Sequence, residues 1–256
     1  MPNTLQLSII VPVYKTEALL GRCLNSIICT SLDSYEILVV ADAPSKECEA
    51  IVQQYQQQNI NIQLFEHKRN LGLFQARLTG LLHAKGKYIA HLDSDDYIEN
   101  DIYKKAFLFA EATSSDITLF QAIKENEQGQ RYNYDYNNLS SFQAKTGMFC
   151  LNKIFSFQTN AWIWHSNCNK LIRSSCYEKV LPYLPKNRYL NLYEDLLFSA
   201  FCYIFLHDTP SISAIDEVGL IYTCNDTSIT RKQNYSASLS KARDTLYVLK
   251  VCSCSL

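Results

Sequence analysis

The sequence predicts an α/β fold with a mostly parallel central sheet and helices on both faces. Short β-rich runs alternate with amphipathic segments of helical length over the first hundred residues. Strands that alternate with such helices are joined by crossovers, which makes neighbouring strands parallel. The chain has 256 residues, of which 47% are hydrophobic and 19% charged, and this is an ordinary globular balance. We therefore expect one large domain rather than two small ones.

Each predicted element of the first half has its own signal. Leu7–Val11 is a β-rich run that ends at Pro12, and residues of the N-cap type, Thr16 and Ser45, stand before the first two helical patterns. Gly86 ends the third helical pattern. The predicted strands are residues 7–11, 36–40, 62–65 and 87–92, and the predicted helices run from Thr16, from Ser45 to about Gln57, and over 73–84.

The second half is less regular. Residues 101–112 have a helical pattern and 116–123 a strand pattern, whereas the polar, Tyr- and Asn-rich stretch 125–141 predicts a hairpin or a mobile loop. We expect a single domain over residues 1–230 and a helical tail over 231–256. The tail is weakly amphipathic, and it either lies on a membrane surface or packs onto the domain or a partner.

Charge and composition exclude several classes of function. The formal net charge of −1 gives no global attraction for nucleic acid or an anionic membrane. The longest apolar run, Leu196–Leu206, is far shorter than the ~20 residues of a spanning helix, so any membrane contact is expected to be peripheral. The ten cysteines are scattered without a CxxC pair, and no signal peptide opens the chain, so we expect a reducing cytoplasm. No pattern indicates an oligomeric state.

The strongest local signal is Asp93-Ser94-Asp95-Asp96, directly after the fourth predicted strand. Three carboxylates in four residues repel one another and favour a compensating cation. Mg²⁺ and Mn²⁺ take one or two carboxylates and fill their shell with phosphate oxygens and water. A metal shared with a diphosphate is one interpretation, and a helix N-cap at Asp96 is the other.

Two further charged residues have a functional and a structural interpretation. Asp42 follows the second strand, where its carboxylate either accepts a hydrogen bond from a nucleotide base or caps the next helix. Arg77 stands among apolar residues of the third helix. Its guanidinium either pairs with Asp42 or a phosphate, or extends to the surface.

The second half offers a candidate base and a candidate sugar platform. Glu194-Asp195 precedes an apolar helical run, so these acids either include a general base or only complement the helix dipole. Trp162, Trp164 and His165 offer flat rings that could stack on a sugar, and the alternative is a packed core edge.

Taken together, these segments resemble the family-2 glycosyltransferases, inverting nucleotide-sugar transferases with a Rossmann-like type-A fold. Each motif alone is weak or moderate, but the ordered set over residues 5 to 230 is specific. The segments that carry the resemblance are Leu7–Tyr14, Glu36–Ala43, Asn70–Arg77, Gly86–Asp96, Asn169–Leu171 and Glu194-Asp195.

The resemblance implies a nucleotide-binding half over residues 1–97. Pro12 and Tyr14 would line the base pocket, with Tyr14 stacking on the base, and Asp42 would accept the base N–H. Arg77 would support the base and diphosphate, and Asp93 would lie toward the ribose and the metal. The donor is then expected to be a UDP-sugar.

The resemblance also implies an acceptor-binding half over residues 98–230. Asp195 of this half would deprotonate the acceptor hydroxyl, whereas Asp95, in the DxD motif of the nucleotide-binding half, would bind Mn²⁺ or Mg²⁺. Glu194 and Trp164 are expected on the acceptor side. The implied acceptor is a glycan or glycolipid of a bacterial surface polysaccharide, such as capsule or lipopolysaccharide, which places the enzyme in the cytoplasm or at the inner face of the membrane.

The sequence departs from the family pattern at several positions, and two of them bear on whether the protein is active. Ala41 replaces the first acid of the second-strand turn, and Thr223 stands where an arginine often follows tyrosine. These losses keep open an alternative function, a catalytically impaired relative that binds a nucleotide or glycan as a scaffold. The retained Asp93, Asp95 and Asp195 favour an active enzyme.

Overall fold

The computed structural model describes residues 5–58, 61–133, 139, 142–155, 162–191, 193–224, 243–244, 247 and 250. The strands are β1 (Leu7–Val13), β2 (Tyr35–Asp42), β3 (Ile62–His67), β4 (Tyr88–His91), β5 (Tyr97–Ile98), β6 (Ile117–Glu125), β7 (Arg131–Asn133), β8 (Lys170–Arg173) and β9 (Ile212–Thr223). The helices are α1 (Glu17–Ile28), α2 (Lys46–Gln58), α3 (Leu73–His83), α4 (Ile102–Thr113), α5 (Gly147–Phe155), α6 (Trp162–His165), α7 (Ser174–Val180) and α8 (Glu194–Phe205), with a 3₁₀ turn at Leu181–Tyr183.

The strands form one sheet in the order β3-β2-β1-β4-β8-β6-β9-β5, and β7 pairs with β6 outside this path. The first four strands are all parallel, as predicted. The second half differs, because β8 lies antiparallel between β4 and β6, and β5 is antiparallel to β9. The sheet is therefore mixed, and its parallel character is concentrated in the first half.

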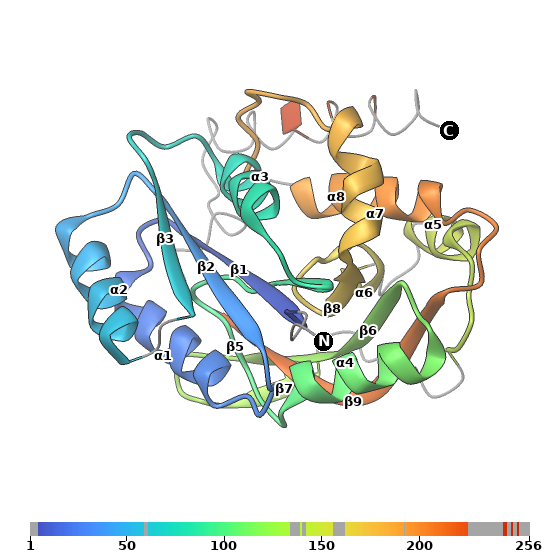
Figure 1. Ribbon diagram of the computed structural model, residues 1–256, viewed down its shortest axis with the longest axis horizontal. Helices are drawn as coiled ribbons and strands as arrows, with labels where there is room; N and C mark the ends of the chain where they lie inside the picture. The colour runs from blue at the N-terminus through green and yellow to red at the C-terminus, as the bar shows by residue number, and fades with distance from the viewer. Residues whose placement is uncertain are drawn as a thin grey trace.

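The helices cover both faces of this sheet, as the sequence predicted: α1, α2 and α4 lie on one face, and α3, α5, α7 and α8 on the other (Figure 1). The strands show why. In β1, Leu7, Ile9 and Val11 belong to the core cluster under α1, whereas Ile10 belongs to the cluster under α3. This alternation of period two buries both faces of one strand.

Most predicted elements are confirmed within two or three residues. The stretch after β6 forms a hairpin with β7, which confirms one of the two alternatives as far as Asn133. The predicted tail lies largely outside the described residues. Among the described residues, no helix is long and apolar enough to cross a membrane.

Candidate functional site

The acidic turn Asp93–Asp96 connects β4 to β5 at the carboxyl end of the parallel strands. The N–H of Asp96 donates to the carbonyl of Asp93 at 2.9 Å, which closes the turn. The N-cap interpretation of Asp96 is wrong, because the next residues form β5 and the next helix begins at Ile102. The acids therefore stand where an α/β sheet binds its ligands.

Helix α1 holds this turn from one side. Thr16 precedes α1 as predicted, but its hydroxyl makes no capping bond and instead lies 2.7 Å from the hydroxyl of Ser94. Ser45, in contrast, does cap α2, since its hydroxyl accepts from the N–H of Cys48. Thr16 thus ties the start of α1 to the acidic turn.

Asp96 holds the turn from the other side. Its side chain is buried, and it accepts a hydrogen bond of 2.8 Å from the backbone N–H of Thr223 at the end of β9. Burial, followed by repulsion from Asp95 and Asp93, raises the pKa of Asp96 well above its ordinary value. Of the three acids, Asp96 is the most deeply buried, and its contacts fix the turn to the end of β9.

Arg22 is a residue of this site that sequence reasoning missed. One terminal nitrogen donates to the carbonyl of Asp95 at 2.9 Å and to the hydroxyl of Thr223 at 2.6 Å. The guanidinium also lies 4.5 Å from the ring centre of Tyr97. A half-exposed arginine on an amphipathic helix gives no sequence signal of such contacts.

Arg77 of α3 lies at the centre of the site. One terminal nitrogen is 2.9 Å from a carboxylate oxygen of Asp93 and 3.4 Å from one of Asp195. Its Nε is 3.5 Å from Glu194. Two interpretations of Arg77 are therefore corrected. Its guanidinium does not pair with Asp42, and its side chain does not reach the surface, because it is fully buried. The acids after β4 and those of α8 meet around one cation.

Two glycines allow α3 to occupy this position. Gly72, the residue before the helix, has a φ of 92°, a conformation that side chains with a Cβ rarely adopt. Gly80 lies against β1, and a Cβ there would come within 2.4 Å of Ile10 Cγ2. The helix can therefore pack directly on the sheet, with Arg77 extending to its carboxyl edge.

Asp42 holds the connection that leads into α3. Its carboxylate accepts hydrogen bonds of 2.8 Å from the backbone N–H groups of both Leu71 and Gly72. One oxygen also lies 2.9 Å from Nδ1 of His67. The side chain is buried, so in this structure it fixes the loop before α3 rather than capping α2.

Asp195 and Glu194 begin helix α8, and their surroundings change their acidity. Burial raises the pKa of Asp195, and Arg77 opposes that change. Burial, with repulsion from Asp195, raises the pKa of Glu194 to about 8. Burial alone would lower the pKa of Arg77, but its acidic neighbours raise it well above the ordinary value. Because one cation faces three carboxyl groups, burial and mutual repulsion favour the protonated form of Glu194.

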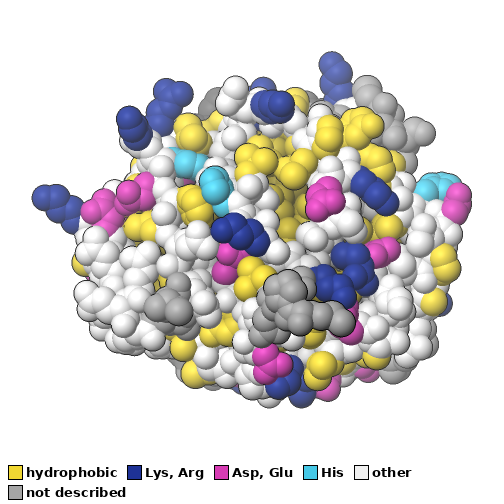
Figure 2. Space-filling view, viewed as in Figure 1, with side chains coloured by type: hydrophobic (Ala, Val, Ile, Leu, Met, Phe, Trp, Pro, Cys, Tyr) yellow, Lys and Arg dark blue, Asp and Glu magenta, His cyan; other side chains and the backbone are white. Residues whose placement is uncertain are grey.

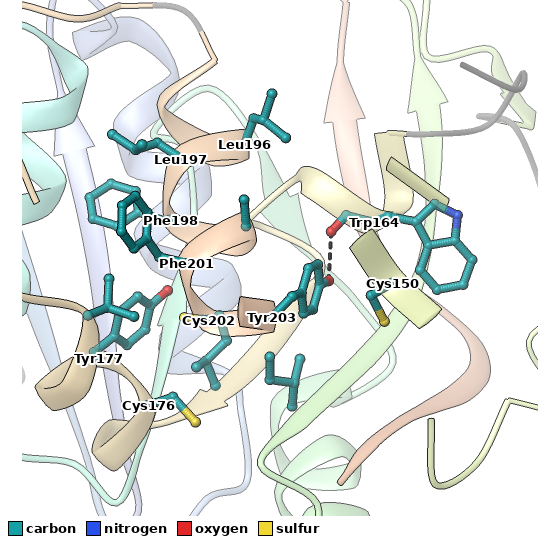
Figure 3. Packing of buried hydrophobic residues seen from close by; sticks show 14 of the residues in the cluster. Cys150, Trp164, Cys176, Tyr177, Leu196, Leu197, Phe198, Phe201, Cys202 and Tyr203 are labelled. Atoms are coloured by element: carbon teal, nitrogen blue, oxygen red, sulfur yellow. Dashed lines mark hydrogen bonds between the residues drawn. The ribbon is translucent and has the colours of Figure 1, made fainter. Parts of the chain in front are cut away.

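A buried polar network connects α8 to strand β8 and to the end of α6. Lys170 of β8 is fully buried and donates to the carbonyl of Trp164 at 2.9 Å and to the hydroxyl of Tyr203 at 3.1 Å. The Tyr203 hydroxyl donates to the same carbonyl, as the dashed line in Figure 3 shows. Burial lowers the pKa of Lys170 to about 8. These bonds fix α8, and so Asp195, relative to the sheet.

The aromatic candidates divide between surface and core. Tyr14 follows β1 with 38% of its area exposed and with Lys15 Nζ 5.2 Å from its ring centre, and Pro12 is buried within β1. Trp164 is only 7% exposed and packs against Phe142, with 4.9 Å between ring centres. Trp164 is therefore part of the core rather than an open platform. The side chain of Trp162 lies outside the described part of the structure.

The carboxylates after β4 suit a cation that is shared with a ligand. No group of three or more His, Cys, Asp or Glu side chains in the described part of the chain is arranged to hold a metal alone. Asp93 nevertheless exposes 29% of its side chain at the turn that also carries Asp95. A hard divalent ion that takes one or two carboxylates and completes its shell with phosphate and water fits this donor set.

The chain is similar in sequence to known glycosyltransferases. The family model described as glycosyl transferase family 2 matches residues 8–172. The chain is 27% identical over 245 residues to the putative glycosyltransferase EpsH of Bacillus subtilis, covering 96% of this chain and 68% of that protein. It is 35% identical over 128 residues to a poly(ribitol-phosphate) beta-glucosyltransferase of Bacillus spizizenii, covering 49% of this chain and 20% of that protein.

A similar solved structure is that of Staphylococcus aureus TarS residues 1–349 in complex with UDP-GlcNAc. Its TM-score is 0.75 at 21% identity, and the match covers 98% of this chain and 66% of that one. At this identity the likeness shows the fold, which is the expected Rossmann-like type-A arrangement. With a family model that matches well over half of its length, the chain belongs to glycosyl transferase family 2.

Proposed function

We propose that this protein is an inverting glycosyltransferase that moves a sugar from a UDP-sugar to a hydroxyl of a surface polymer, with Mn²⁺ or Mg²⁺ bound at Asp95. The observation that carries the proposal is the meeting of Asp93 and Asp195 on a single nitrogen of Arg77. A donor-side acid and a candidate base from another half of the chain thereby border one reaction centre. The curated relatives named for glycosyl transfer support this class of reaction.

Asp195 is the proposed base. A carboxylate with a raised pKa accepts a proton more readily than an ordinary one, and Arg77 keeps it ionised and oriented. It takes the proton of the acceptor hydroxyl while that oxygen attacks the anomeric carbon from the face opposite the leaving diphosphate. One displacement of this kind inverts the anomeric carbon and requires no covalent glycosyl-enzyme.

The donor is held by residues at the ends of β1, β2 and β4. Tyr14 stacks on the base beside Pro12, and Asp42 fixes the loop at Leu71 and Gly72 against which the base rests. Asp93 and Asp95 would hold the metal, which supplies Lewis-acid stabilisation of the charge on the leaving diphosphate. The solved relative in complex with UDP-GlcNAc supports a uridine nucleotide as donor.

The test is a thermal unfolding measurement with UDP and MnCl₂, separately and together. UDP with Mn²⁺ at about 100 times its dissociation constant adds about 2.7 kcal/mol of stability, or roughly 5–10 °C for a chain of this size. UDP alone should shift the melting temperature much less. The control is Asp95→Asn, which removes one negative charge from the acidic turn and should abolish the metal-dependent part of the shift in melting temperature. Equal shifts with and without metal would refute metal-assisted donor binding.

The scaffold alternative predicts a different outcome. Its basis is the pair of departures from the family pattern at Ala41 and Thr223. In the structure, however, the Thr223 hydroxyl accepts a hydrogen bond from Arg22, and the Thr223 N–H donates one to Asp96. A scaffold would bind UDP with Mn²⁺ but release no UDP from any UDP-sugar supplied with acceptor. Following nucleotide release over a panel of UDP-sugars separates the two.

A further inference from the structure

A cavity of about 340 Å³ lies between two segments beside the site, and most of the side chains that line it are polar. One wall is the connection from β3 to α3, with the first turn of that helix, and the other is the segment leading to α8. The side chains that matter are those of Arg69, Asn70, Gln75, Asn187, Arg188 and Tyr189. None of the residues lining the cavity is acidic.

Both walls are fixed by hydrogen bonds across the cavity. Gln75 Nε2 donates to the carbonyl of Arg188 at 3.0 Å. The N–H of Leu73 donates to Asn191 Oδ1 at 2.9 Å, and that of Phe74 donates to the carbonyl of Leu190 at 3.0 Å. The first N–H groups of α3 are therefore already satisfied. Any anion bound here is held by side chains rather than by the helix end.

The cavity carries two arginines without a counter-charge on its walls. Arg69 is exposed and has no hydrogen bond or ion pair within the described ranges of the chain. The guanidinium of Arg188 stacks on Tyr247 at 4.2 Å, and its Nε is buried without a partner. The nearby acid, Asp244, is buried and used by Asn191 and Arg243. In Figure 2 basic side chains also stand out along the upper left margin, on the side where the β3–α3 connection runs in Figure 1.

The chemistry of the cavity matches a ligand that has both a phosphate and hydroxyl groups. Guanidinium groups bind phosphate through paired, charge-assisted hydrogen bonds. The amides of Asn70, Gln75 and Asn187 and the phenol of Tyr189 are the groups that bind sugar or alditol hydroxyls. None of the lining side chains carries a negative charge that would hold a bare cation.

The cavity adjoins the loop on which the base rests, through Leu71, and both of its walls lead along the chain to the reaction centre. Arg77 lies four residues after the start of α3, which is about 6 Å along a helix, and Asp195 follows Tyr189 by six residues. Neither Tyr14 nor Asp93 lines the cavity. A chain-like acceptor could place one unit here and the hydroxyl of a neighbouring unit at Asp195.

We infer that this cavity is an acceptor subsite that binds a phosphate and the adjoining hydroxyls of a polyol-phosphate chain. The inference rests on the proposed function, since it names the acceptor class for that site. Arg69 and Arg188 bind the phosphate, and the amide side chains bind the alditol. The enzyme would then recognise its acceptor by a charged unit beside the one that it glycosylates.

The test is calorimetric binding of a short glycerol-phosphate oligomer to the whole protein without any nucleotide. The double variant Arg69→Gln/Arg188→Gln should weaken binding at least tenfold. The matched control, Lys68→Gln/Lys186→Gln, removes two exposed neighbouring charges outside the cavity and should change binding less than threefold. Melting temperatures verify that each variant folds, and Arg188→Lys should retain part of the affinity. Equal effects of the two double variants would overturn the inference.

Two further ligands identify what is recognised. A neutral maltose oligomer should not bind, and inorganic phosphate should bind at least tenfold more weakly than the glycerol-phosphate oligomer. Phosphate that binds as tightly as the oligomer, or vesicles of phosphatidylglycerol that bind when the oligomer does not, would overturn the inference. This binding experiment contains no donor, so it is independent of the nucleotide-release assay. A protein that binds the oligomer but releases no UDP in that separate assay would refute only the proposed function.

Discussion

The two halves of the molecule supply acidic residues in different ways. In the first half, Asp93 and Asp95 follow a short parallel strand, and their positions result directly from the alternation of strand and helix. In the second half, Asp195 begins a helix that is held by the buried Lys170 and by contacts remote in sequence. A strand end can thus be located from a pattern, whereas a helix end in a mixed sheet depends on tertiary contacts.

The division of roles between the two halves is tested most directly at Asp195. Asp195→Asn keeps the shape of the side chain but removes the proton acceptor, so sugar transfer should fall by about 10²–10⁴-fold. UDP affinity should remain within about twofold, because the donor residues belong to the first half. Steady-state transfer rates and UDP titration measure the two. Asp208→Asn, at an exposed acid, is the control and should transfer normally; near-normal transfer by Asp195→Asn would refute its role as base.

The next largest effect is expected at Arg77, where the two halves meet. Arg77→Met leaves three buried or half-buried acids without their cation and should lower the free energy of unfolding by about 3–5 kcal/mol. Urea unfolding measures this loss. Adding Glu194→Gln to Arg77→Met should recover part of it, since fewer acids then repel. A decrease in the free energy of unfolding of less than about 1 kcal/mol would mean that Arg77 does not stabilise the three acids.

A smaller effect is expected from the pH dependence of Glu194. Its pKa is raised to about 8 in the folded protein, so the native state binds more protons than the unfolded state between about pH 4.5 and 8. The stability from this group is complete at low pH and is lost as the pH rises through 8, by at most about 1.4 kcal/mol per unit. Urea unfolding from pH 5 to 8 should show a flatter profile for Glu194→Gln than for the native protein. Parallel profiles would contradict a protonated Glu194.

The smallest effect concerns the hairpin of β6 and β7. Arg131 pairs there with Glu99 and Glu125, and its side chain is 41% exposed. Because solvent and salt screen such pairs, Arg131→Ala should cost about 0.2–1 kcal/mol, and less in 1 M NaCl. Transfer activity should not change. A loss of several kcal/mol would show that the hairpin contributes to the second half as strongly as its core does.

The sequence predicted the first half well because its signals are local. The periodicity of β1 and β2 and the acids after β4 needed no knowledge of distant residues. What it did not predict depends on distant contacts: Thr16 bonds Ser94 instead of capping its helix, and Arg77 selects Asp93 and Asp195 instead of Asp42.

The same reason explains the other differences in the site. Trp164 entered the core because Phe142 and α8 pack around it, which its polar neighbours His165 and Asn169 do not indicate. Arg22 resembled an ordinary surface residue of α1, since its partners Asp95 and Thr223 are far away in the chain. The fold class was thus predictable from pattern, and the pairing of charges was not.

The guanidinium shared by Asp93, Glu194 and Asp195 has an evolutionary consequence. Acids from two separate segments depend on one positive charge of a third, so substitutions at these four positions are not independent of one another. A descendant that lost Arg77 would keep its fold only by also neutralising one of the acids, and each such change removes a participant in the chemistry. Substitutions at these four positions are therefore expected to arise together, in lineages that have already abandoned sugar transfer.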